Sequence, residues 1–202
     1  MNDAFPSILG RATILAIASV LGGVCFADEG PRYTFAEVGY AHVEFDRFNE
    51  ADGDQFGLGG SLALTDMLHV FGSYAQGQVE GSNFPNIDTT AANAGLGVNF
   101  AVSPTIDLVG RAAVVYAKVE LNNFDEDDTG LGLTAGVRAM IAPQLELNGG
   151  VSYVDFGNDS DDTALEVGAV YSFTDMFAVT ANASFGDETT AVGVGARLYL
   201  GH

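Results

Sequence analysis

Apolar and polar side chains alternate with a period of two residues from residue 32 to the C-terminus. In the segment 55–65, Phe56 and Leu58 fall on one face, whereas Gln55 and Gly57 fall on the other. Successive side chains of a β-strand point to opposite faces, so this period indicates strands whose two faces meet different surroundings. We expect strands at 32–45, 54–64, 68–79, 90–102, 105–120, 129–141, 144–155, 163–173, 176–185 and 190–200.

The connectors between these segments alternate between long, acidic stretches and short turns. An antiparallel barrel in an outer membrane has long loops outside and tight turns on the periplasmic side. The pattern therefore predicts an all-β fold, a single antiparallel transmembrane barrel of ten strands with both termini on the periplasmic side. Eight strands is the alternative, and it requires two of the segments to be loops. The long connectors are 46–54, 80–89, 122–129, 155–162 and 186–189, and the short ones are 65–67, 103–104, 142–144 and 174–176.

Alternation alone does not say which face meets solvent, and a secreted soluble barrel holding an apolar ligand has the apolar face inside. Two features favour an apolar face that points outward into lipid. The polar face is rich in Gly and Ser, which suit a narrow lumen, and it carries ions in the middle of strands. Ions in a lumen must be paired or solvated, because an isolated buried ion costs several kcal/mol. We expect a lumen charge network that largely plugs the barrel, formed by Glu37, Asp107, Arg111, Arg138, Glu146, Glu166 and Arg197.

Aromatic residues gather near the strand ends, which is typical of the two girdles that bound the apolar belt of a membrane barrel. Those expected toward the long loops are Phe45, Phe48, Tyr116, Phe124, Tyr153, Phe156 and Phe185. Those expected toward the short turns are Tyr33, Phe100, Tyr171, Phe173, Phe177 and Tyr199.

The first 27 residues have the pattern of a cleaved secretory signal peptide. Arg11 precedes the apolar run 12–24, and Ala27 supplies a small residue at the cut. The barrel domain would then comprise residues 28–202. Cys25 is the only cysteine and lies inside the leader, so the mature chain would have no disulfide and no thiol nucleophile.

The charge balance is strongly acidic, with 27 Asp and Glu against 7 Lys and Arg and a net charge of −20. Such a surface repels phosphates, so we expect no nucleic-acid partner. Clusters such as 125–128 offer oxygen ligands that divalent cations accept, and weak cation binding at the acidic loops is one interpretation. We favour the other, a solvated acidic rim that prevents aggregation. If lipopolysaccharide surrounds the loops, we expect cations to bridge its phosphates to these carboxylates.

Two stretches, "GLGVNFAVSPTIDLVGRAAVVYAKVE" at 95–120 and "LTAGVRAMIAPQLELNGGVSYVDF" at 133–156, resemble the small outer-membrane β-barrel superfamily around OmpA and OmpX. The resemblance implies contact with outer-membrane lipid and with the barrel-assembly machinery, which reads the last strand. That strand alternates through Val192, Val194 and Leu198, but the chain ends in Gly201-His202, where the family has an aromatic residue.

Members of this superfamily include structural proteins, narrow pores and a few enzymes, so the resemblance alone does not choose a function. The three histidines are His42, His69 and His202, and we expect none of them beside a carboxylate at the outer rim. We therefore expect no enzymatic activity and no cofactor. The function that we predict is a structural or surface-interaction role in the cell envelope, and the alternative is a narrow, weakly cation-preferring pore.

Overall fold

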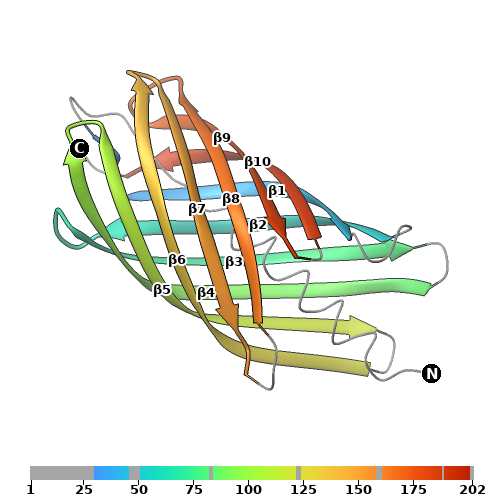
Figure 1. The fold of residues 1–202 in the computed structure, drawn as a ribbon. Coiled ribbons are helices and arrows are strands. Elements are labelled where there is room, and N and C mark those ends of the chain that lie inside the picture. The colour runs from blue at the N-terminus through green and yellow to red at the C-terminus, as the bar shows by residue number, and fades with distance from the viewer. Residues whose placement is uncertain are drawn as a thin grey trace.

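The computed structural model describes residues 30–45, 51–81, 84–121, 124–157, 161–187 and 189–200, so the predicted signal peptide lies outside the described residues. Each strand pairs with its neighbours in sequence, and the first pairs with the last, which closes an antiparallel barrel (Figure 1). No helix in the described part of the chain is long and apolar enough to cross a membrane. The strands are β1 (Phe35–Phe45), β2 (Ala51–Ala63), β3 (Leu68–Gly81), β4 (Phe84–Ser103), β5 (Ile106–Leu121), β6 (Phe124–Ala142), β7 (Leu145–Asp155), β8 (Asp161–Ser172), β9 (Phe177–Gly186) and β10 (Thr189–Tyr199).

The prediction of ten strands is confirmed, but two of the expected loops are mostly strand. β4 begins at Phe84, where the sequence pattern predicted residue 90, and β6 begins at Phe124, where it predicted residue 129. The acidic residues in these stretches suggested loops. They sit instead on extended strands. On β4 the alternation continues, and Val79 and Ile87 pair on the inner side. The β6 extension carries four consecutive acidic residues, 125–128, and continues through its backbone pairing with β5.

The short turns lie at the end of the barrel that we call the periplasmic end. Two of them share the tripeptide Thr-Asp-Met, at 65–67 and 174–176. In the first turn the Thr65 hydroxyl accepts hydrogen bonds from the backbone N–H groups of Met67 and Leu68, at 3.2 and 3.0 Å. Thr174 does the same in the second turn. A hydroxyl that binds the backbone two and three residues on stabilises a tight reversal, so these connections need few residues.

Large apolar side chains cover the outside of the barrel, as the alternation predicted. Phe56 is 70% exposed and Leu131 is 66% exposed, whereas their neighbours in sequence point inward. A sheet with this much exposed apolar surface is expected to meet lipid or a partner rather than water.

If the outer face meets lipid, a charge introduced there should lower the free energy of unfolding more in the middle of a strand than near its end. Val114→Arg places a cation on the outer face in the middle of β5, where the side chain is 52% exposed. We expect a loss of about 2–4 kcal/mol in the free energy of unfolding, because arginine at the bilayer midplane is poorly solvated. Thr163→Arg, at the outer end of β8, is the matched control and should change stability little. Urea unfolding in lipid vesicles measures both, and equal losses would contradict the assignment.

Candidate functional site in the barrel lumen

The seven predicted lumen residues all fall on the inner face of the barrel, as the strand register shows. Glu37 on β1 and Arg197 on β10 are direct cross-strand partners. The Arg197 Nε donates a hydrogen bond of 2.6 Å to Glu37 Oε2, and its Nη2 donates to the same oxygen. Thr180 donates to the other oxygen of Glu37 at 3.1 Å. Arg197 also stacks on Phe35, with 4.0 Å between the guanidinium carbon and the ring centre. This ion pair is almost completely removed from solvent.

A second ion pair lies on the opposite wall, between Arg138 on β6 and Glu146 on β7. The Arg138 Nε donates to Glu146 Oε1 at 3.1 Å, and the exposed fractions of the two side chains are 4% and 1%. The guanidinium group also lies over the ring of Tyr33, 4.2 Å from its centre. In both pairs each charge thus faces an opposite charge, although Glu146 Oε2 has no hydrogen-bond partner among the described residues.

The remaining predicted residues have other surroundings. Asp107 accepts a hydrogen bond of 2.8 Å from the Tyr33 hydroxyl. Arg111 lies over the ring of Phe71 at 5.2 Å and, together with Glu166, lines a cavity of about 40 Å³. The lumen at this level thus leaves a small cavity beside Arg111 and Glu166, with room for only a few water molecules.

The segment Gly30–Thr34, which we call the strap, was missed by the sequence interpretation. The alternation predicted a strand from residue 32 and placed Tyr33 in the periplasmic girdle, but β1 begins at Phe35 and Tyr33 lies in the lumen, 7% exposed. The Tyr33 ring stacks on His69 of β3, with 4.7 Å between ring centres. Gly97, the cross-strand partner of His69, has no side chain, and a Cβ there would collide with the imidazole ring.

Contacts of the strap reach several sides of the periplasmic mouth. The backbone carbonyl of Arg32 accepts a hydrogen bond of 3.2 Å from Arg138 of β6, across the barrel from β1. The Arg32 side chain donates to the carbonyl of Asp175 in the β8–β9 turn at 3.0 Å. It also lies over the ring of Tyr199, 4.4 Å from its centre. The strap therefore crosses the mouth of the lumen and is held by contacts on opposite walls.

The outer half of the lumen contains buried apolar side chains as well as buried polar ones such as Gln55, Thr89 and Ser184. Val43, Val79 and Ile87 are at most 1% exposed. The aromatic residues Phe45 and Phe156, predicted in the outer girdle, also point inward. Two groups of inward side chains fill this half. The first, called the outer lumen core, is Val43, Phe45, Val79, Ile87, Val119 and Ala191, and the second is Val115, Ala117, Val154, Phe156 and Ala164.

The odd or even position of these aromatic residues along their strands already indicated that they point inward. Phe45 has the same parity as Glu37 on β1, Phe156 has the parity of Glu146, and Tyr199 has the parity of Arg197. Tyr199, 1% exposed, is thus also a wrong girdle prediction, as are Tyr33, Phe45 and Phe156. The predicted girdle residues Phe100, Tyr153, Tyr171, Phe173, Phe177 and Phe185 do point outward, and Phe48 lies outside the described residues.

One histidine contradicts the expectation that none lies beside a carboxylate at the outer rim. His42 and Asp54 are cross-strand partners on the outer face of β1 and β2, and His42 Nδ1 lies 2.9 Å from Asp54 Oδ1. The Tyr40 hydroxyl donates to the same carboxylate oxygen at 2.5 Å. A pair of this kind orients an imidazole ring, but general-base catalysis also needs a reacting group within hydrogen-bond reach.

Acidic side chains form a rim on the outer ends of the strands. Lys118, the only lysine of the chain, binds Glu120 at 2.7 Å and lies 3.6 Å from Asp125. The hydrogen bond to Glu120 raises the pKa of Lys118. Among the described residues, no group of three or more His, Cys, Asp or Glu side chains is arranged to hold a metal ion.

Comparison with known proteins agrees with this architecture. The translocator domain of the autotransporter NalP from Neisseria meningitidis has a TM-score of 0.55 at 10% identity, over 98% of this chain and 96% of that chain. The NanC porin has a TM-score of 0.52 at 10% identity, over 82% of this chain and 100% of that chain. No curated protein matches at a significant level. The model of the outer membrane protein beta-barrel domain matches residues 13–173, so the chain belongs to this family of outer-membrane barrels.

Proposed function

We propose that this chain is a closed, non-catalytic outer-membrane barrel with a structural or surface-interaction role. Residues 1–27 would direct its export as a signal peptide and would then be removed. The observation that carries the proposal is the presence of two different seals along the lumen. The periplasmic seal consists of the strap and the two buried ion pairs. The outer seal consists of the outer lumen core. A solute would have to pass both.

The two seals exclude water and ions for different physical reasons. Apolar constrictions block conduction by dewetting, because a narrow passage lined by Val and Ile cannot solvate an ion. Paired charges fill space and offset each other, so a permeating ion meets little net charge there. Barrels with few strands have interiors that side chains can fill, which is consistent with a blocked lumen.

The acidic rim supports the surface role. Carboxylates at the outer ends of β2, β4 and β6, such as Asp52, Asp88 and Asp127, face outward above the apolar belt. We propose that divalent cations bridge these carboxylates to lipopolysaccharide phosphates, and that the barrel-assembly machinery inserts the chain through β10. Net negative charge of this size also keeps the exposed ends from associating.

A narrow, weakly cation-preferring pore is the second candidate. NanC, which shares the fold at low identity, is a porin. Hydrogen bonds and ring contacts help to hold the strap, and its release would open the periplasmic mouth without breaking covalent bonds. The acidic rim would then attract cations to the outer mouth.

Single-channel recordings in planar bilayers separate the two candidates. We expect the wild-type barrel to give no defined conductance steps. The strap variant Arg32→Gly/Tyr33→Gly should also be silent, because the outer lumen core remains. The variant Phe45→Ala/Ile87→Ala should be silent because the strap remains. The four substitutions combined should give steps of small conductance, because the two ion pairs stay on their opposite walls but the strap no longer fills the space between them.

Each variant must first show the mobility shift of a folded barrel on an unheated gel, so that silence reflects a closed lumen and not an unfolded chain. Frequent, well-defined steps from the wild-type barrel would contradict the closed barrel. Steps from the strap variant alone would favour the second candidate, in which the strap is the gate.

A further inference from the structure

A completely buried histidine lies against the strap in the periplasmic half of the lumen. Neither ring nitrogen of His69 on β3 has a hydrogen-bond partner among the described residues. The imidazole ring stacks on Tyr33 of the strap and lies 6.2 Å from the ring of Phe71, between ring centres. These surroundings suit the neutral imidazole, because burying a charged ring costs far more solvation free energy than burying an uncharged one.

Two arginines lie one aromatic ring away from this histidine. Arg138 on β6 lies over the ring of Tyr33, and Arg111 on β5 lies over the ring of Phe71. A proton on His69 would therefore add a third positive charge to this part of the lumen. Like charges repel more strongly in a low-dielectric interior than in water, and a protonated imidazole has two N–H donors that both need acceptors.

The nearby carboxylates are already bound to other groups. Asp107 on β5 accepts the hydrogen bond from the tyrosine of the strap, and Glu146 on β7 accepts one from Arg138. The side chain of Asn99 on β4, which also faces His69, is neutral. Either carboxylate would have to give up its present partner to offset a charge on His69.

Release of the strap removes this conflict. Tyr33 leaves with the strap, and the imidazole of His69 then meets the water of the periplasmic mouth. A histidine in water takes up a proton below about pH 6.5. The docked strap excludes that proton, so the docked state loses stability relative to the released state as the pH falls, by up to about tenfold for each pH unit below this value.

We propose that acidification releases the strap through protonation of His69, which makes the periplasmic seal sensitive to pH. This role of His69 rests on the proposed function, in which the strap is part of that seal. The observation that carries it is a buried imidazole without hydrogen bonds, stacked on the tyrosine of the strap and flanked by two arginines. The outer lumen core consists of apolar side chains and does not respond to pH, so the wild-type barrel stays closed.

Single-channel recordings of the variant Phe45→Ala/Ile87→Ala test the proposal, because this variant keeps the strap and weakens the outer seal. They are made at about pH 7.5 and about pH 4.5, on either side of the range in which a hydrated histidine titrates. We expect rare openings at most at the higher pH. The open probability at the lower pH should be at least about tenfold higher, and at most about a hundredfold.

His69→Phe, added to this variant, should remove the acid response, because phenylalanine keeps a flat ring against Tyr33 and cannot take up a proton. His69→Gln, a second neutral side chain, should remove it as well, so the result does not depend on how well phenylalanine fits. An acid response that both variants keep would overturn the proposal. One that survives His69→Phe and is lost in Asp107→Asn would overturn it too, because the carboxylate would then be the titrating group.

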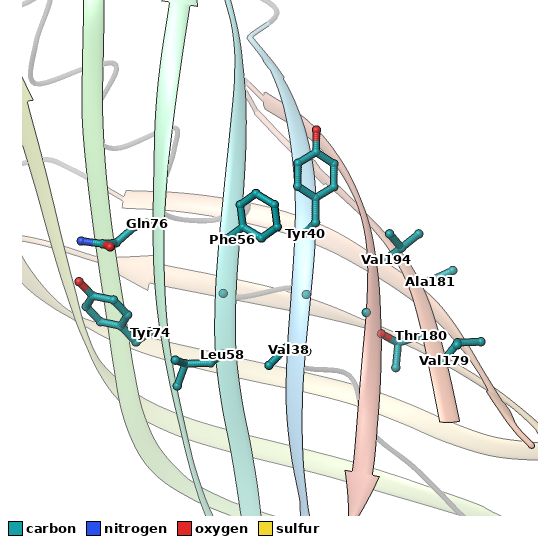
Figure 2. A pocket seen from close by; sticks show the side chains of 13 residues that line it. Val38, Tyr40, Phe56, Leu58, Tyr74, Gln76, Val179, Thr180, Ala181 and Val194 are labelled. Carbon is teal, nitrogen blue, oxygen red and sulfur yellow. The ribbon is translucent and has the colours of Figure 1, made fainter. Parts of the chain in front are cut away.

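His42 supplies the matched control, as the other histidine in the described part of the chain. It lies on the outer face of β1, next to Tyr40, which together with Phe56 lines a hollow of about 890 Å³ on that face (Figure 2). The strap does not contact this face. His42→Phe should therefore leave the acid response as it is, and loss of the response would contradict the role of His69.

The barrel that combines the four substitutions of the strap and the outer lumen core distinguishes the two ways of failing. If it conducts at neutral pH while Phe45→Ala/Ile87→Ala shows no acid response, the proposal for His69 fails and the two seals stand. If it is silent at both pH values, the two-seal model fails, and a nitroxide label on the strap tests His69 directly.

The label is attached at Pro31→Cys in a Cys25→Ser background, which leaves a single cysteine in the chain. Its mobile fraction, read from the electron paramagnetic resonance spectrum, should rise at acidic pH. His69→Phe should abolish that rise. An equal mobile fraction at both pH values in the barrel that retains His69 would overturn the proposal.

Discussion

Replacing Arg197 by methionine should lower the free energy of unfolding by about 3–5 kcal/mol, because the substitution leaves a buried carboxylate without its partner. The Glu37 side chain is completely buried and makes its contacts with Arg197 and Thr180. In the variant, Glu37 keeps only the neutral hydroxyl among these groups. Urea titration of the barrel in lipid vesicles, with the folded fraction read from mobility on unheated gels, measures the loss.

The double variant Glu37→Met/Arg197→Met separates the cost of an unpaired charge from the cost of lost packing. Two apolar side chains of similar length remove both charges, and such replacements are often neutral or stabilising. We therefore expect the double variant to recover most of the stability that Arg197→Met loses. A double variant as unstable as the single one would show that the methionines do not fit this position, and that packing rather than charge pairing explains the loss.

Glu37 and Arg197 were predictable as lumen residues because both are charged residues on the polar face of their strands. The same reasoning identified Arg138 and Glu146, which also form a pair. Parity is a robust signal in a barrel, because a shift of one residue would turn every side chain to the opposite face. The number of strands was predictable from the alternation of long, acidic connectors with short turns, with eight strands as the alternative.

Strand ends were harder to predict, because acidic residues at the tips of β4 and β6 have the composition of a loop. Asp88 and Asp125 face outward there, while Ile87 on the β4 extension faces inward and packs with Val119 of β5. β4 continues because the inner side of its extension is buried, whereas the β6 extension continues through backbone pairing with β5. A composition-based boundary follows the charges and therefore ends too early.

The strap was beyond the sequence argument for a different reason. Alternation describes a segment relative to its own strand, and it does not say whether the residues before that strand turn across the lumen. Tyr33 has the parity of an inward residue, but its partners Asp107 and His69 belong to β5 and β3. Contacts between strands so far apart in the barrel depend on closure and lumen width, which no local pattern contains.

The apolar outer lumen core leads to the second large effect. Ile87→Ala should lower the free energy of unfolding by about 2–5 kcal/mol, because it removes buried methylene groups and leaves a cavity among tightly packed neighbours. Ile87 is completely buried and packs with Val43, Val79 and Val119 on three other strands. The same urea titration in vesicles measures this loss.

Ile141→Ala is the matched control, since the same atoms are removed from a side chain that is 56% exposed on the outer face of β6. Lipid chains can fill the space there, so we expect a much smaller loss. The comparison therefore tests whether the apolar side chains in the outer half of the lumen pack against one another or only line an open passage. If both variants lost the same stability, the inward apolar side chains would not form a solid seal, and the closed barrel that we propose would lose its outer barrier.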